Sequence, residues 1–323
     1  MISSIKHMYS WLSVDAHQRR GLRALQIAIG LMMLFRASTE FRFAAFLWGP
    51  SGIGQGSSSA FLGAELGRWL DRLYDSELGV QGMLLVLAAA AACLVIGVHT
   101  RLAAFASLIA VRFFESRLSE LGDGGDNVTR LVLTYMVFAL PAHRVAKPGS
   151  LPVWLHNVAI LAIGLQIAVV YLTSGMLKLT GERWANGTAL YTISQVEWFS
   201  NPSFRDLFKN PTFSALATYT TVFFQIWFPV AVLTRLKPVW LLVGIGMHVG
   251  IAMFMGLVCF STAMIGLELF LITDGEFAAL EGRLRRWNSR LRAGWLGRGS
   301  ALHEWPSLKQ LWNVARFRGK VAP

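Results

Sequence analysis

Lys178 stands at the end of a long apolar run and is the residue best placed to act as a base. On a helix, Gly164, Ile167, Tyr171, Ser174 and Lys178 follow spacings of three and four and share one face. A lysine in this position can extend its ammonium group into the headgroup region at little cost. Alternatively, partial removal from water makes the amine a usable base. Arginine separates the two roles, because a guanidinium group reaches the surface equally well but stays charged.

Two further ionisable residues, His248 and Glu268, lie deep within apolar sequence. If a turn near Gly256 and Leu257 joins their helices, their depths differ by about 3 Å, at roughly 1.5 Å per residue. We expect the two side chains to approach within hydrogen-bonding distance, directly or through one water, because pairing offsets the cost of placing either in hydrocarbon. The pair is either a structural contact or part of a proton relay or quinone-contacting site. Since no second ligand follows His248 at helical spacing, no metal site is expected.

Other polar residues within apolar sequence have mainly structural explanations. Thr218, Thr221 and Gln225 share one helical face, which is typical of hydrogen bonding between membrane helices. A polar cavity wall that faces Lys178 is the alternative. The pair Asp126–Asn127 is expected to cap the start of a helix. Downstream of Lys178, Gly181, Trp184 and Gly187 predict a turn in which Trp184 is an aromatic anchor at the membrane interface.

The composition determines which elements must hold these residues. Of the 323 residues, 54% are hydrophobic and only 15% are charged, whereas soluble domains have about 25% charged residues. This deficit of charge excludes a disordered chain, a coiled coil and an ordinary soluble enzyme. It predicts an all-α, polytopic integral membrane bundle. Both cysteines lie within apolar runs, so neither a disulfide framework nor a zinc site is expected.

We expect about eight transmembrane helices. Arg23 and Arg36 are expected to snorkel at the two ends of the first of them. Several segments are shorter than the roughly 20 residues that a perpendicular span requires, so their ends are less well defined than their existence. The expected spans are 21–35, 80–98, 102–114, 128–140, 153–176, 213–233, 239–255 and 258–272.

The distribution of charge orients these spans in the cell membrane. With both termini in the cytoplasm, the cytoplasmic segments hold 19 of the 30 lysines and arginines and only 5 acidic residues. A seven-span arrangement would place the basic C-terminal segment outside. The chain is therefore divided into a cytoplasmic N-terminal segment (1–20), a transmembrane domain (21–275) and a basic amphipathic cytoplasmic tail (276–323).

The tail explains most of the net charge of +12. Ten basic residues lie between Arg283 and Lys320, and tryptophans such as Trp287, Trp295 and Trp312 are interleaved with them. Basic residues mixed with tryptophans directly after an apolar run favour an anionic lipid bilayer surface as the partner, and not nucleic acid.

The string Y-x-x-S-G-x-x-K-L-x-G-x-x-W-x-x-G-x-A-L-Y, from Tyr171 to Tyr191, resembles the HTTM family, the horizontally transferred transmembrane domain shared with vitamin K-dependent gamma-carboxylases. The Leu-Trp-Gly-Pro-Ser-Gly motif at 47–52, the Arg20-x-x-Arg23 pair and His248 in a late helix fit the same family. The resemblance covers roughly residues 20–275.

The resemblance implies a chemistry for Lys178. In the carboxylases, the lysine at this position is the proposed base in the oxygenation of a reduced quinone. The resulting alkoxide removes a glutamyl γ-proton, and carbon dioxide traps the carbanion. By this resemblance, Lys178 is a candidate catalytic base. His248 and Glu268 are further catalytic candidates, because they lie deep within apolar sequence. Tyr171, Ser174, Trp184 and Gln225 are candidates for binding the cofactor.

Two departures separate the chain from the carboxylases. Residues 124–129 read Gly-Gly-Asp-Asn-Val-Thr, without the histidine that the carboxylases carry there, and residues 273–323 form a basic tail in place of a large soluble region. The chain is closer to short bacterial members, including the sporulation-delaying-protein B group, which is associated with maturation of antimicrobial peptides. Any activity is therefore expected to differ from carboxylation in substrate or outcome.

Two functions remain open at this point. The first is a membrane-embedded enzyme, quinol-dependent or peptide-modifying, that acts on a peptide or small molecule at the extracytoplasmic face. The second is a non-catalytic maturation or assembly subunit that works with another membrane protein. A transporter is the weakest reading, because no inverted repeat or pair of broken helices is evident.

Overall fold

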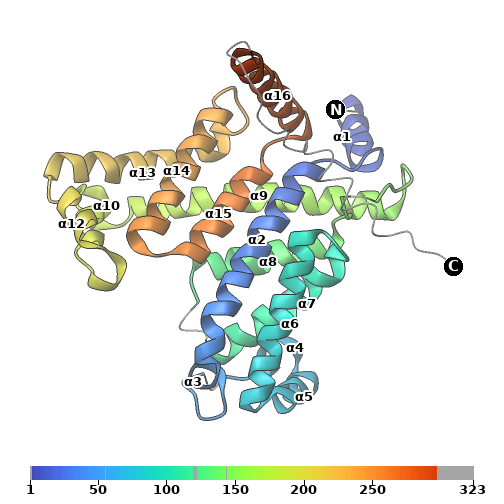
Figure 1. Ribbon diagram of the computed structural model, residues 1–323, viewed down its shortest axis with the longest axis vertical. Coiled ribbons are helices and arrows are strands. Elements are labelled where there is room, and N and C mark those ends of the chain that lie inside the picture. The colour runs from blue at the N-terminus through green and yellow to red at the C-terminus, as the bar shows by residue number, and fades with distance from the viewer. Residues whose placement is uncertain (1, 55, 119–121, 143, 297–323) are drawn as a thin grey trace. The chain divides into compact units, whose positions relative to one another are not determined.

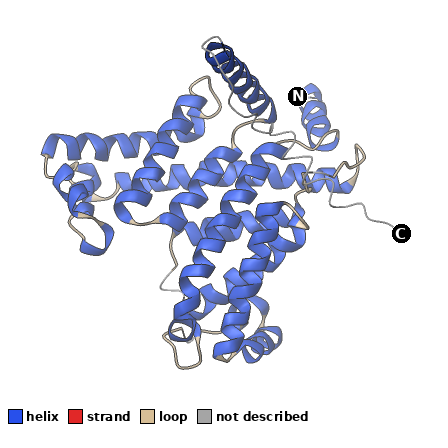
Figure 2. Ribbon diagram, in the orientation of Figure 1, coloured by secondary structure: helices blue, strands red, loops and turns tan. Residues whose placement is uncertain are grey.

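The computed structural model describes residues 2–54, 56–118, 122–142 and 144–296, and within them all regular secondary structure is helical (Figures 1 and 2). The expectation of an all-α protein is confirmed. Contacts divide the chain into two units, Met1–Asp274 and Gly275–Pro323. The described part of the second unit belongs to a single helix, α16 (Asp274–Leu296). Most of the tail, including Trp305, Trp312 and Lys320, lies outside the described residues.

Each expected span coincides with a helix. These helices are α2 (Arg19–Glu40), α6 (Glu77–Ile96), α7 (Thr100–Arg117), α8 (Gly124–Phe138), α9 (Leu151–Leu179), α13 (Pro211–Ala231), α14 (Lys237–Met255) and α15 (Val258–Phe270). The helix α1 (Ile2–Ser13) precedes them. Shorter elements connect them, namely α3 (Ala44–Trp48), α4 (Ser59–Leu62), α5 (Ala64–Tyr74), α10 (Glu182–Ala185), α11 (Ala189–Ser194), α12 (Pro202–Phe208) and the 3-10 turns Phe41–Phe43 and Glu197–Phe199.

Fewer than eight of these helices are long and apolar enough to cross a bilayer alone. Among the described residues, four segments qualify, namely Arg19–Trp48, Glu77–Ile96, Leu151–Leu179 and Lys237–Met255. A fifth qualifies only when Val258–Phe270 is taken together with Asp274–Ser289. The helices α8 and α15 have 15 and 13 residues and are too short alone, and α7 carries charges near both ends. The protein is thus a helical protein with several apolar helices of membrane-spanning length.

Local capping groups determine where the helices of the core begin and end. The Ser76 hydroxyl accepts a hydrogen bond of 2.9 Å from the amide of Gly79 at the start of α6, which ends at Gly97 with a φ of 88°. At the start of α8, Asp123 accepts from the amide of Asp126, and the Asp126 side chain accepts from the amide of Asp123. The cap is therefore Asp123 with Asp126, which corrects the expected Asp126–Asn127 cap.

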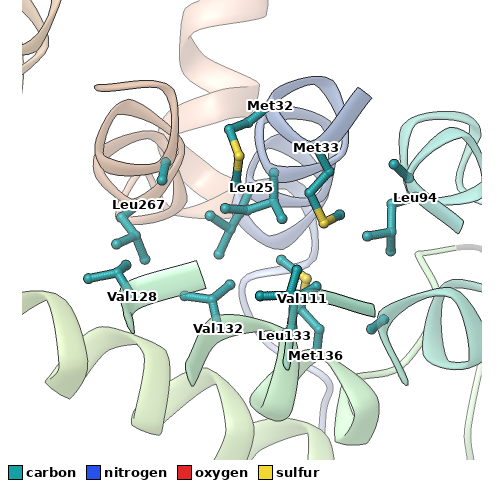
Figure 3. Packing of buried hydrophobic residues seen from close by; sticks show 14 of the residues in the cluster. Leu25, Met32, Met33, Leu94, Val111, Val128, Val132, Leu133, Met136 and Leu267 are labelled. Carbon is teal, nitrogen blue, oxygen red and sulfur yellow. The ribbon is translucent and has the colours of Figure 1, made fainter. Parts of the chain in front are cut away.

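Helix α2 is the centre of the first packing group. It packs along α6 on one side and α15 on the other, while α7 and α8 complete the group (Figure 1). Leu25, Met32 and Met33 of α2 are at most 6% exposed. Figure 3 shows them facing side chains of α6, α8 and α15, such as Leu94, Val132 and Leu267. This apolar packing holds α15, and with it Glu268, in place.

Helix α9 belongs to the second group, in which it packs along α13 and also contacts α15. Gly175 permits the close approach to α13, because a Cβ atom there would lie 3.0 Å from the backbone nitrogen of Ile226. Helix α14 packs against α15. Three helices from distant parts of the sequence, α9, α14 and α15, therefore meet in the interior.

Candidate functional site

Tyr171, His248 and Glu268 form one hydrogen-bonded cluster where α9, α14 and α15 meet. The Tyr171 hydroxyl lies 2.9 Å from Nε2 of His248 and donates a hydrogen bond to Oε1 of Glu268. His248 Nε2 and Glu268 Oε1 are 3.9 Å apart. The three residues are 1%, 2% and 0% exposed. The expected proximity of His248 and Glu268 is therefore found, but a tyrosine hydroxyl joins them in place of a direct bond or a water.

Aromatic rings enclose the cluster. The Tyr171 ring stacks on Phe228 with centroids 3.9 Å apart and meets the edge of Phe224 at 5.6 Å. On the other side, the ring of Phe260 packs edge-on against His248 at 5.5 Å. These apolar neighbours lower the local dielectric, which strengthens each polar contact and raises the cost of an unpaired group.

The hydrogen bonds specify where protons stand within the cluster. Because the Tyr171 hydroxyl donates to Glu268, it can only accept from His248, so Nε2 of a neutral His248 carries its proton. The other nitrogen, Nδ1, then has a free lone pair. Among the described residues, neither His248 Nδ1 nor Glu268 Oε2 has a hydrogen-bond partner. The cluster thus leaves one imidazole nitrogen and one carboxyl oxygen without a hydrogen bond among the described residues.

Gly244 makes room for the carboxylate. A Cβ atom at this position of α14 would lie 2.1 Å from Oε1 of Glu268. One turn of α14 further along, the chain presents His248 from the same helix. Gly244 leaves space for the Glu268 carboxylate against α14, and His248 lies beside the same carboxylate.

Lys178 lies apart from this cluster. It is seven residues beyond Tyr171 on α9, about 10 Å along the axis at roughly 1.5 Å per residue. Its ammonium nitrogen stands 5.0 Å above the ring of Trp184 and 3.4 Å from the carbonyl oxygen of Ser174. The side chain is half-buried. These contacts are those of a cation held on an aromatic ring at a helix end.

The four residues considered for a quinone, Tyr171, Ser174, Trp184 and Gln225, have different surroundings in the described part of the chain. Tyr171 uses its hydroxyl within the cluster, Ser174 and Trp184 accompany Lys178, and Gln225 is half-buried on α13 with its Oε1 unpartnered within the described residues. The two cavities described below touch none of these side chains. These four side chains line neither of the two polar cavities, and their role toward a quinone stays a prediction.

Two polar cavities lie elsewhere in the first unit. One, of about 480 Å³, is lined by residues of the connection between α3 and α6, including Arg68 and Asp75, and by Arg117 of α7. The other, of about 250 Å³, lies among α2, α8 and α15 and includes Arg36, Glu40 and Asp126.

The two arginines of α2 that were expected to snorkel, Arg23 and Arg36, have partners within the protein. Arg36 pairs with Glu40 at 2.7 Å and with Asp126 at 2.5 Å. Arg23 donates hydrogen bonds to the carbonyl oxygens of Leu94 and Val95 at the end of α6. Both guanidinium groups therefore have protein partners, which differs from the expected snorkelling toward headgroups.

Sequence reasoning missed the place of Tyr171. Helical spacing predicts that Tyr171 shares the face of Lys178, but it does not relate the depth of Tyr171 to the depths of His248 and Glu268. A buried tyrosine hydroxyl usually finds a partner, and this one lies well inside the long apolar run 153–176. The need of a buried tyrosine hydroxyl for a hydrogen-bond partner therefore points from Tyr171 to His248 and Glu268.

Comparisons with known proteins give limited information. No protein-family model matches the chain, and no solved structure matches it. A segment of 146 residues is 28% identical to a Bacillus subtilis (strain 168) protein named "Uncharacterized protein YitO". The alignment covers 42% of this chain and 47% of that protein, so the match spans about half the length of the relative. The chain is similar to part of that protein, and the likeness carries no statement of activity.

Proposed function

We propose that this chain is a multi-pass membrane protein with eight crossing helices that modifies a peptide or small molecule at its extracytoplasmic face. In this proposal, the Tyr171–His248–Glu268 cluster takes up the proton that the modification releases. One observation carries the proposal: three ionisable side chains from three helices, each at most 2% exposed, meet within hydrogen-bonding distance. Ionisable residues inside a membrane domain are expensive and usually functional. The resemblance to HTTM proteins supports the same class of function.

The proposed proton path uses only groups of this cluster. A proton from the substrate binds Nδ1 of His248, and the resulting imidazolium is stabilised by the Glu268 carboxylate 3.9 Å from Nε2. The Tyr171 hydroxyl fixes the positions of His248 and Glu268 through its two hydrogen bonds. This path does not use Lys178, whose ammonium group lies 5.0 Å from the centre of the Trp184 ring.

Glu268→Gln is the direct test. Glutamine has nearly the same shape but cannot hold the negative charge that stabilises a protonated His248. We expect mass spectrometry of exported peptides and small molecules to find a product that wild-type cells make and that Glu268→Gln cells lose. Protein amount and size-exclusion profile should stay the same. Glu65→Gln on the exposed side of α5 is the control and should keep the product. An unchanged product in Glu268→Gln would refute the proton role.

A non-catalytic maturation or assembly subunit is the second candidate, and the packing of Lys178 on Trp184 favours it. An anchoring lysine tolerates arginine, which keeps the cation–π contact, whereas a base does not. If Lys178→Arg and Glu268→Gln both retain the pathway product while Lys178→Ala loses folded protein, the subunit function holds. If Lys178→Arg abolishes the product in folded protein, Lys178 is a base and the anchor role is refuted.

A further inference from the structure

Helix α5 has an apolar stripe that the rest of the protein leaves exposed. One side of the helix, with Gly67 and Leu70, is buried. On another side, Leu66, Trp69 and Leu73 follow helical spacings of three and four, and they are 52%, 55% and 54% exposed. A tryptophan between two leucines on one exposed face is typical of a helix that lies in a membrane interface.

The position of α5 in the chain brings it close to the end of a long apolar helix. Helix α6, which is long and apolar enough to cross a bilayer, begins at Glu77. Tyr74, the last residue of α5, lies three residues earlier, so the two are at most roughly 11 Å apart at 3.8 Å per Cα step. Helices α3 and α5 both contact α6 and lie together at one of its ends (Figure 1). With α6 across the bilayer, α5 therefore lies at the bilayer surface.

A third side of α5 lines the cavity of about 480 Å³. Three arginines, Arg68, Arg72 and Arg117, contribute to this lining together with two aspartates, Asp71 and Asp75. Three positive and two negative charges leave an excess of one positive charge, which attracts anions. Within the described part of the chain, neither Arg68 nor Arg72 forms an ion pair.

Both aspartates already have partners. The Asp71 carboxylate accepts a hydrogen bond of 2.6 Å from the Ser57 hydroxyl. Asp75 pairs with Arg117 at 3.5 Å. The Arg117 side chain is only 6% exposed and also donates a hydrogen bond of 2.8 Å to the carbonyl oxygen of Trp48. The two exposed guanidinium groups of α5 are therefore available to a ligand, and Arg117 adds a buried positive charge to the same cavity.

An anionic phospholipid matches both the stripe and the cavity. A guanidinium group binds phosphate oxygens through paired N–H donors, and acyl chains cover apolar side chains. Trp69 and Arg72 are neighbours on the helix surface at a spacing of three, so the stripe and the cavity meet along α5. A soluble anion would use the arginines but leave the stripe in contact with water.

We propose that α5 and this cavity bind an anionic phospholipid. Its phosphate group is bound by Arg68 and Arg72, and its acyl chains lie along Leu66, Trp69 and Leu73. This inference rests on the membrane placement in the proposed function, which puts α5 at the extracytoplasmic surface, but it does not use the proton cluster.

Quenching of a fluorophore by lipid-borne nitroxides tests the stripe. The fluorophore NBD is attached at Leu66→Cys in a Cys93→Ser, Cys259→Ser background. The full chain is then reconstituted in phosphatidylcholine vesicles with nitroxides on the acyl chains. We expect strong quenching at Leu66→Cys and several-fold weaker quenching at Ala64→Cys, which is exposed on another side of α5. Equal quenching at the two positions would refute the proposal.

A label on α6 separates this result from the membrane placement itself. Leu85 is 58% exposed on a helix of spanning length, so Leu85→Cys is quenched wherever α6 crosses the bilayer. Quenching there without quenching at Leu66→Cys would refute the lipid site and keep the membrane placement. No quenching at Leu85→Cys would refute both. Glu268→Gln should change neither result, so a failure of the proposed proton role stays distinguishable.

The same label at Leu66→Cys tests the charge of the lipid. In phosphatidylcholine vesicles, nitroxide-labelled phosphatidylglycerol should quench more than an equal fraction of labelled phosphatidylcholine. We expect a relative binding constant of roughly tenfold, equal to about 1.4 kcal/mol. The double variant Arg68→Gln, Arg72→Gln should reduce this preference to near unity, whereas Arg42→Gln, at an exposed position outside the cavity lining, should keep it. A preference that persists in the double variant would refute the role of the arginines.

Inorganic phosphate distinguishes a lipid from a soluble anion. At constant ionic strength, replacing chloride by phosphate should leave the preference for phosphatidylglycerol intact, because the acyl chains hold the lipid at a high local concentration. Loss of the preference in phosphate alone would assign the cavity to a soluble anion and would refute the lipid.

Discussion

A tyrosine hydroxyl that serves a histidine and a glutamate at the same time reduces the cost of placing both in an apolar interior. The hydroxyl has one proton to give and accepts another, so it suits a donor on one side and an acceptor on the other. Tyr171 has both partners, His248 and Glu268, on two other helices. Its removal therefore affects three helices at once.

Tyr171→Phe deletes this one oxygen atom. We expect the free energy of unfolding to fall by about 1–2 kcal/mol, because His248 and Glu268 lose a shared partner while polar contacts in membranes are individually modest. Thermal unfolding in detergent measures the change. Tyr219→Phe is the matched control, since its hydroxyl donates a hydrogen bond of 3.0 Å to Ala185 at an exposed position. A loss of stability in Tyr171→Phe no larger than in Tyr219→Phe would contradict the role of the cluster.

The proximity of His248 and Glu268 could be predicted from the sequence, because a single turn joins their helices and the rise per residue then gives both depths. The helical rise cannot predict that Tyr171 joins His248 and Glu268. Tyr171 comes from a helix that is distant in sequence, and only packing of α9 against α13 and α15 brings it there. The pairing of Arg36 with Asp126 was missed for the same reason, because the two are 90 residues apart.

At the scale of elements, the positions of all eight apolar helices followed from runs of hydrophobic residues. Apolar length is a local property, so no tertiary information is needed to find it. No such run indicates the short helices between residues 41 and 75 and between residues 182 and 208. Their sequences are mixed, and tertiary contacts determine their structure. The contact between α14 and α15 is likewise invisible in a hydropathy pattern, since it depends on single small residues.

Gly244 and Gly246 test that contact as a matched pair on α14. A Cβ atom at Gly244 would lie 2.1 Å from Glu268, whereas nothing lies within 4 Å of one at Gly246. We expect Gly244→Ala to lower the free energy of unfolding by about 1–3 kcal/mol, because the new methyl group displaces the carboxylate or α15. Gly246→Ala should cause no loss, since alanine favours helix. Thermal unfolding measures the stability of both variants. Equal stabilities would refute the close approach of Gly244 to Glu268.

At the scale of the whole molecule, accessibility of single cysteines determines the number of crossings. In a Cys93→Ser, Cys259→Ser background, Ser51→Cys should be labelled only from outside the cell. Gly122→Cys, between α7 and α8, best distinguishes eight membrane crossings from four. With eight crossings residue 122 lies outside the cell, whereas with four it lies in the cytoplasm. We expect labelling from outside. Ser300→Cys, which lies outside the described residues, should be labelled only from inside.

A contrary pattern in this experiment has a specific meaning. Labelling of Gly122→Cys only from the cytoplasm would show that α7 and α8 do not cross. Labelling of Ser300→Cys from outside would show an odd number of crossings and would place the basic tail away from the anionic inner leaflet.

The length of α9 links the fold to the thickness of its surroundings. Its 29 residues extend about 43 Å at roughly 1.5 Å per residue, against a hydrocarbon layer of about 30 Å. In a bilayer of this thickness the helix either tilts or extends its ends into the headgroup regions. In the proposed membrane topology, hydrophobic mismatch therefore acts on the helix that carries Tyr171. A thinner bilayer makes α9 lean further, so lipid chain length becomes a variable that bears on the hydrogen bonds of the cluster.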